Sequence, residues 1–219
     1  MSAWWFLAAL GVVGYAWTAE FRLRRAQTVA RATIFDTCQA LFDAPQLAPG
    51  THAYPVLRGT HRGLPIKLEV VVDTLAVRKL PVLWLKVDVL QALPIAGTLD
   101  YLVRPLNHEF WSPNVALAHE LRLPAQWPQY ARLGTDQPAM RALLPQLDPF
   151  IAAFSDERIK ELLVTPKGVR VVYLAGQGGR AHYGVLRRAH FAALPLPADL
   201  VATPLKLACD VHQALAGAA

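Results

Sequence analysis

The sequence predicts an α+β protein: an N-terminal transmembrane helix followed by a domain of antiparallel β-meanders that helices cover. Three observations lead to this fold class. The chain begins with an uncharged apolar stretch, later segments alternate apolar and polar residues, and others repeat apolar residues every three or four positions. The chain has 219 residues, 54% of them hydrophobic and 17% charged, which is enough for one well-packed domain.

The N-terminal stretch Ser2–Ala19 carries no charged side chain. As a helix it is roughly 27 Å long, close to the roughly 30 Å hydrocarbon core of a bilayer. Aromatic residues, which favour the headgroup interfaces, lie at its two ends: Trp4, Trp5, Tyr15 and Trp17. These features favour a single-pass membrane anchor. The alternatives are a buried core helix and a cleaved signal peptide, although a positive start and a small-residue cleavage site are both lacking.

The charges after the anchor predict its orientation. Positive residues gather there, at Arg22, Arg24 and Arg25, and the positive-inside rule keeps such a flank in the cytoplasm. We therefore expect the N-terminus outside and the C-terminal domain in the cytoplasm, with a bacterial inner membrane as the expected setting. The same arginines can bind lipid headgroups. Gly11 and Gly14 offer small surfaces on which another transmembrane helix could pack.

The chain divides into an anchor over 1–19, a juxtamembrane amphipathic helix over 20–43 and a cytoplasmic α+β domain over 50–219. Residues 20–43 contain neither Pro nor Gly and repeat apolar residues every three or four positions, which predicts a helix continuous with the anchor. The stretch 44–50 has two prolines and a glycine, and is expected to end that helix.

About seven strands in two groups are expected. In the first group, 64–73 and 80–90 alternate apolar and polar residues, which predicts half-buried strands. Shorter stretches at 54–58 and 98–104 complete an antiparallel meander, since the connections are too short for parallel crossovers. The second group is expected at 160–165, 169–174 and 180–191.

Two helices are expected around the second group of strands. Residues 138–154 have helical spacing, but Pro145 and Pro149 predict a kinked or broken helix. The last helix is expected to start at Thr203 and to carry His212 on its buried face as a core histidine. Strands followed by a helix occur twice, so a division into halves 50–154 and 155–219 is the alternative to a single unit.

The long irregular segment 105–137 contains the weak catalytic candidates His108, Glu109, His119 and Glu120. Such residues can act as general acids or bases. Their spacing matches no metal-ligand pattern, because a zincin helix places two histidines four residues apart with a glutamate between them. No metal site is therefore expected. The alternative is that these are solvated side chains of a loop that covers the sheet.

Other features argue against further functions. The net charge of +6 includes the arginines after the anchor. The sequence has no basic stripe with interleaved aromatic residues, so nucleic-acid binding is not expected. The glycines at 176–179 lie between two predicted strands rather than before a helix, so they predict a hairpin turn and no nucleotide cofactor. Cys38 and Cys209 stand alone, which is typical of small buried residues in a reducing compartment.

The leading functional hypothesis is non-enzymatic. We expect an accessory, assembly or structural subunit that docks on a membrane protein complex through its anchor and its cytoplasmic domain. Its partners would be the bilayer and other membrane protein subunits. One alternative is a membrane-tethered enzyme or small-ligand binder with a pocket under the 105–137 loop. Another is a lipid-surface protein that high salt would release.

Overall fold

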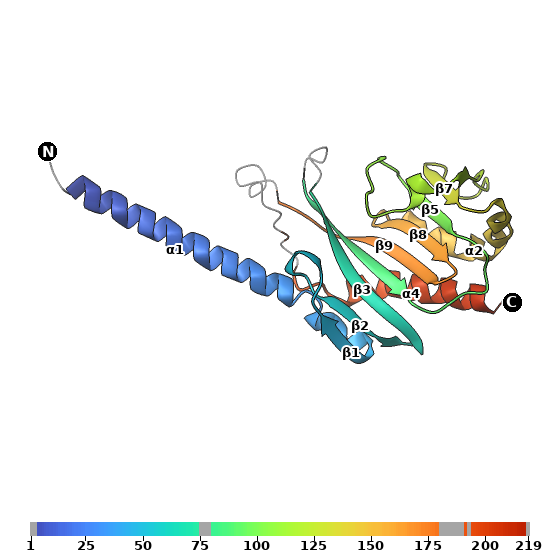
Figure 1. Ribbon diagram of the computed structural model, residues 1–219, viewed down its shortest axis with the longest axis horizontal. Helices are drawn as coiled ribbons and strands as arrows, with labels where there is room; N and C mark the ends of the chain where they lie inside the picture. The colour runs from blue at the N-terminus through green and yellow to red at the C-terminus, as the bar shows by residue number, and fades with distance from the viewer. Residues whose placement is uncertain (1–3, 75–79, 180–190, 192–193, 218–219) are drawn as a thin grey trace.

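One nine-stranded antiparallel sheet organises the chain, in the strand order β1-β2-β3-β4-β9-β8-β5-β7-β6. The computed structural model describes residues 4–74, 80–179, 191 and 194–217 (Figure 1). The strands are β1 (Asp43–Ala48), β2 (Val56–His61), β3 (Leu64–Asp73), β4 (Val82–Val89), β5 (Leu99–Val103), β6 (His119–Glu120), β7 (Ala131–Thr135), β8 (Ile159–Thr165) and β9 (Gly168–Gln177). The predicted α+β class is confirmed.

Three α-helices and several short 3₁₀ turns complete the described structure. The α-helices are α1 (Trp4–Ala32), α2 (Leu144–Ile151) and α4 (Ala198–Ala216). The 3₁₀ turns are η1 (Asp36–Leu41), η2 (Thr51–Ala53), η3 (Asn114–Ala116), η4 (Pro138–Leu143) and η5 (Ala152–Ser155). Figure 1 shows α4 lying along one face of the sheet, whereas α1 projects away from the domain.

Helix α1 contains most of the uncharged stretch and continues past it as one helix. Among the helices of the described residues, none combines the length and the apolar character needed to cross a membrane. The transmembrane span expected over 1–19 is therefore not supported by the structure. Side chains of α1 are described from Gly14 onward apart from 16, 23 and 24, so the predictions on Trp4, Trp5, Gly11 and Arg24 lie outside them.

The amphipathic helix expected over 20–43 is shorter than predicted. Helix α1 ends at Ala32, and the chain then turns so that Ile34, Phe35 and Cys38 are fully buried. Burial of these three side chains favours the tighter turn η1 over a straight continuation of the helix. The stretch 44–50, expected only to end the helix, contains most of the exposed edge strand β1. An edge position tolerates a proline, which cannot donate a ladder hydrogen bond.

The two longest predicted strands of the first group are confirmed as β3 and β4. Burial along β3 alternates as expected for a strand with one covered face. Strand β4 is buried on both faces instead, because the rings of Trp84 and Trp111 pack with their centroids 5.4 Å apart. Trp111 comes from the loop after β5, so the sequence of β4 alone does not reveal this second cover.

The two predicted groups of strands form a single sheet. Strand β9 pairs along the full length of β4, from Val82 opposite Gln177 to Val89 opposite Val169. The β8–β9 hairpin thus lies between β4 and β5, and a division at residue 154 does not separate two sheets. The strand predicted over 180–191 lies outside the described residues except for Phe191, which is buried.

A tight turn joins β8 to β9, and it depends on Gly168. This residue has φ +140°, and a Cβ there would collide with the carbonyl oxygen of Val89. Only glycine fits a position that combines this dihedral with such a close backbone approach. The turn therefore packs directly against the end of β4.

The helical segments differ from the prediction in their limits. As expected from its prolines, the segment after β7 is broken into η4, α2 and η5. Helix α4 begins at Ala198, five residues before the expected start, so Thr203 and Pro204 lie inside it instead of capping it. His212 is buried as predicted, and its Nε2 lies 3.0 Å from the carbonyl oxygen of Gln91.

Candidate functional site

The four candidate residues of the loop lie in different environments. His119 and Glu120 form the exposed edge strand β6, and Glu120 pairs with Arg132 at 3.4 Å. His108 is half-buried, and Glu109 is buried. Among the described residues, no hydrogen bond or ion pair joins one His–Glu pair to the other. The two His–Glu pairs are therefore not in direct contact in the described structure.

Glu109 forms a buried ion pair with Lys160 of β8. Their charged atoms are 2.9 Å apart, and the side chains are 0% and 6% exposed. The backbone N–H groups of Leu106 and His108 also donate to the Glu109 carboxylate, at 2.8 and 3.2 Å. Burial alone would raise the pKa of Glu109, but the hydrogen bond and charge of Lys160 outweigh it and lower that pKa. This carboxylate anchors the loop to the sheet.

A pair of carboxyls that was not predicted as a site lies on the sheet face opposite α4. Asp100 of β5 aligns with Leu163, and Glu161 of β8 aligns with Leu102. The two acidic residues are therefore diagonal neighbours on one face of adjacent strands. Both are completely buried. A carboxylate is expensive to bury unless it is paired, so this arrangement needs an explanation.

The loop after β5 covers this carboxyl pair. Trp111 packs with Leu102 and Val172, the two residues that align with Glu161 on its neighbouring strands. Ser112 Oγ donates to Asp100 Oδ2 at 3.2 Å, and Asn114 Nδ2 donates to the Asp100 backbone carbonyl at 3.1 Å. The loop thus places an indole, a hydroxyl and an amide over the two carboxyls.

Several polar atoms at this place lack a partner among the described residues. Four are acceptors: Asp100 Oδ1, Glu161 Oε1, Glu161 Oε2 and Asn114 Oδ1. One is a donor, Trp111 Nε1. Buried polar groups are nearly always satisfied in native proteins, so such a concentration is unusual. We refer to Asp100, Glu161, Asn114 and the covering Trp111 as the buried oxygen site.

Burial dominates the electrostatics of the two carboxyls. It raises the pKa of Asp100 well above its ordinary value, and the negative charge of Glu161 raises it further. Burial also raises the pKa of Glu161 to about 7, although the Ser112 hydroxyl and the charge of Arg170 oppose the change. Both shifts disfavour the simultaneous ionisation of the two carboxyls, and no ion pair with either of them is formed among the described residues.

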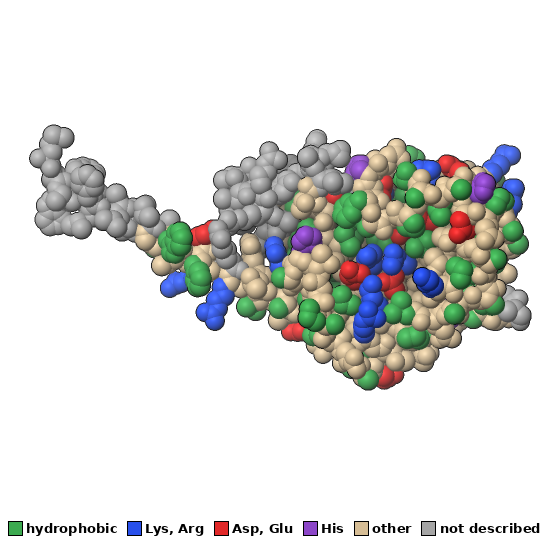
Figure 2. Space-filling view, in the orientation of Figure 1, with side chains coloured by type: hydrophobic (Ala, Val, Ile, Leu, Met, Phe, Trp, Pro, Cys, Tyr) green, Lys and Arg blue, Asp and Glu red, His purple; other side chains and the backbone are tan. Residues whose placement is uncertain are grey.

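An ion network on the same sheet face borders the buried oxygen site. Arg170 Nε pairs with Asp88 Oδ1 at 2.5 Å, and Lys67 Nζ lies 3.5 Å from Asp88 Oδ2. Glu69 Oε2 receives Lys67 at 2.9 Å and Lys86 at 3.3 Å. Figure 2 shows basic and acidic side chains gathered in the middle of the face that α4 leaves uncovered. Each of these three cations already has a carboxylate partner.

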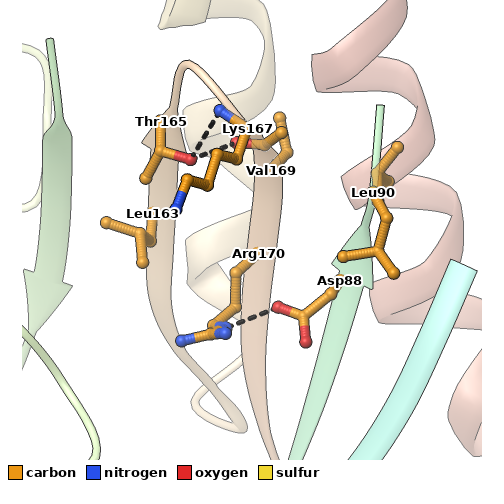
Figure 3. A pocket seen from close by; sticks show the side chains of 9 residues that line it. Asp88, Leu90, Leu163, Thr165, Lys167, Val169 and Arg170 are labelled. Atoms are coloured by element: carbon orange, nitrogen blue, oxygen red, sulfur yellow. Dashed lines mark hydrogen bonds and ion pairs between the residues drawn. The ribbon is translucent and has the colours of Figure 1, made fainter. Parts of the chain in front are cut away.

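A hollow of about 270 Å³ lies at the end of this face, at the β8–β9 turn. Figure 3 shows Arg170 and Asp88 joined beside it and the Lys167 side chain reaching toward Leu163. Leu163 aligns with Asp100, so the hollow and the buried oxygen site are neighbours across this one side chain. A second hollow of about 350 Å³, next to Trp127 and Asp148, lies between the loop and α2.

A weak signal in the sequence could have identified the buried oxygen site. Asp100 and Glu161 lie two positions from Leu102 and Leu163 in their strands, so each shares a face with an apolar residue. A carboxylate on an apolar strand face indicates that something covers this face. The covering loop and the pairing of β5 with β8 come from distant parts of the chain, and neither follows from local pattern.

A comparison of the chain with protein-family models, with curated proteins and with solved structures gives no match. Function must therefore be argued from the structure. The protein is an α+β domain on one antiparallel sheet, with a projecting N-terminal helix and a buried oxygen site beneath a covering loop.

Proposed function

We propose that the protein is an accessory subunit that α1 holds at a membrane and whose domain docks on a membrane protein complex. The observation that carries this proposal is the exposure of large apolar side chains on α1. Tyr15, Trp17 and Phe21 are 77%, 76% and 63% exposed. Exposed apolar surface of this kind marks contact with a membrane or another protein.

The described part of the domain does not cover these aromatic rings. Figure 1 shows that only the C-terminal end of α1 meets the domain, and that the rest of the helix projects away from the domain. At that end, the Arg31 guanidinium lies over the Tyr54 ring, 5.5 Å from its centroid. This cation–π contact helps to fix the helix at the domain. The aromatic segment therefore remains available to a lipid bilayer.

The charges of α1 support a membrane as the cover. Arg22 and Arg25 are exposed immediately after the aromatic segment, where they can reach anionic headgroups. With the positive flank inside, the domain would lie in the cytoplasm and the N-terminus outside. A charged residue placed among the aromatic rings should weaken this attachment, whereas the same change further along the helix should not.

Purification of the tagged full-length protein from native membranes in mild detergent tests the docking proposal. Wild type is compared with Trp17→Glu and Phe21→Glu, and with the control Ala26→Glu on an exposed position of the same helix. We expect a stoichiometric membrane protein partner with wild type and the control, and its loss in the other two variants. Recovery of an intact monomer without any partner from wild-type membranes would contradict docking.

A second candidate function, small-ligand binding beneath the covering loop, is favoured by the buried oxygen site. Four buried acceptor oxygens without donors among the described residues suit a ligand that accepts electron pairs. This function is compatible with membrane attachment, because α1 and the site lie in different parts of the molecule (Figure 1).

A further inference from the structure

The side chains of Asp100 and Glu161 are diagonal neighbours on one face of adjacent strands, and each carboxyl affects the titration of the other. When both are ionised, they present only acceptor oxygens, so no direct hydrogen bond can form between them. Either a proton or a cation must lie between the two groups. The choice between these depends on how many of the surrounding oxygens each would satisfy.

A shared proton satisfies too few of these oxygens. One proton joins one oxygen of Asp100 to one oxygen of Glu161. Of the four acceptors without donors, it would leave the second Glu161 oxygen and Asn114 Oδ1, and the free donor Trp111 Nε1 could pair with only one of these two. Asn114 is 1% exposed, and its amide group is held against Asp100 by the hydrogen bond to the backbone carbonyl. Its Oδ1 is buried and has no hydrogen-bond partner among the described residues, which is an observation separate from the two carboxyls.

Nearby cations of the chain do not satisfy the site either. Arg170 and Lys86 are the positive side chains whose charges act on Glu161. Arg170 is paired with Asp88, and Lys86 is paired with Glu69. Among the described residues, neither cation forms an ion pair with Glu161, and turning either one toward it would leave Asp88 or Glu69 with Lys67 as its only cation.

We propose that Asp100, Glu161 and Asn114 bind a hard divalent cation of the magnesium or calcium class beneath Trp111. Two carboxylates balance its charge, and the amide oxygen supplies a third ligand. Magnesium is typically bound by one or two carboxylates with water in the remaining positions, and calcium also takes amide oxygens. The proposed ligands are two carboxylates and one amide. The described residues contain no cluster of three His, Cys, Asp or Glu side chains that could hold a metal ion, so the site depends on the amide as its third ligand.

Two neighbours position these ligands. Ser112 donates to the second oxygen of Asp100, which leaves the first oxygen for the cation. Trp111 covers the site from the loop and restricts the approach of bulk water, which strengthens electrostatic binding. Such hydrogen bonds to ligands typically change metal affinity by about 10–100-fold. Removal of the Ser112 hydroxyl should therefore weaken binding without removing a ligand.

The test uses the full-length protein in mild detergent after treatment with a chelator. Magnesium or calcium chloride is added, and the unfolding temperature is measured. Terbium serves as a luminescent substitute, because energy transfer from a nearby tryptophan makes its bound form emit. We expect either cation to raise the unfolding temperature, and terbium to emit when bound. Asp100→Asn and Glu161→Gln should lose both effects, and Ser112→Ala should weaken terbium binding roughly tenfold.

The control variant is Glu120→Gln, which neutralises an exposed carboxylate on β6, outside the site. It should bind terbium like wild type. The proposal would be overturned if the wild-type protein neither bound terbium nor changed its unfolding temperature with added cation. This outcome is measured on wild type alone, so it does not depend on whether any variant folds. Stabilisation by Glu161→Gln that is the same with and without cations would show a shared proton instead. Neither outcome depends on membrane attachment.

Discussion

The buried ion pair between Glu109 and Lys160 shows how a residue that looks catalytic in the sequence can serve the fold. Removing one partner of a buried pair leaves the other charge uncompensated, which typically costs about 3–5 kcal/mol. We therefore expect Glu109→Gln to lower the free energy of unfolding by that amount in urea titrations. Glu120→Gln, on the exposed strand β6, should change it by less than about 0.5 kcal/mol. Equal effects of the two substitutions would contradict this assignment.

The pH dependence of stability provides an independent check on Glu109. Its pKa is lowered in the folded protein, so the unfolded state binds more protons when the carboxylate titrates. The stability that Glu109 contributes is present above its ordinary pKa of 4.5 and is lost as pH falls below this value. The difference in unfolding free energy between wild type and Glu109→Gln should therefore shrink below about pH 4.5. A constant difference down to pH 3 would be inconsistent with the pair.

The two cysteines are expected to be unreactive while the protein is folded. Both are free and buried, and burial raises the pKa of Cys38 and raises that of Cys209 to about 11. Because the thiolate is the reactive form, little of it exists at neutral pH. Ellman's reagent should label neither thiol in the native protein and both after unfolding. Labelling of the native protein within minutes would show that one of these sites opens.

At the scale of elements, the β8–β9 hairpin provides the sharpest test of the backbone. Gly168→Ala places a methyl group against the Val89 carbonyl at φ +140°, so we expect a loss of about 3 kcal/mol or more in unfolding free energy. Gly63, in the β2–β3 turn, is the matched control. Its φ of +76° also disfavours alanine, but open space surrounds it, and Gly63→Ala should cost only about 1 kcal/mol. Thermal or urea unfolding measures both.

The elements also show where local sequence was informative. The alternation in β3 predicted a strand that the structure confirms. The start of α4 was placed too late, because Thr203 and Pro204 resemble a cap and a first turn. Packing of Val201 against the core extends the helix in the N-terminal direction beyond that signal. Burial can thus outweigh local capping preferences.

At the scale of the whole molecule, the α+β class could be predicted but the sheet could not. Strands β4 and β9 are far apart in sequence, and nothing in either one specifies the other as its neighbour. The buried oxygen site depends on the same kind of information. Asp100 and Glu161 come together only because β5 pairs with β8, and Asn114 joins them only because its loop folds back over β5.

Membrane attachment through α1 is the central claim about the whole molecule. Exposed Tyr15, Trp17 and Phe21 support it, while no helix in the described part of the chain reaches the length and apolar character of a span. Mutants in the aromatic segment and the control Ala26→Glu change the same helix by the same charge.

The most direct measurement is the fraction of full-length protein that stays in the membrane pellet after washes with high salt and then with alkaline carbonate. We predict that wild type and Ala26→Glu stay in the pellet through both washes, and that Trp17→Glu and Phe21→Glu are released. Release of wild type by salt alone would indicate surface binding by charge. Wild-type protein found in the supernatant before any wash would contradict membrane attachment.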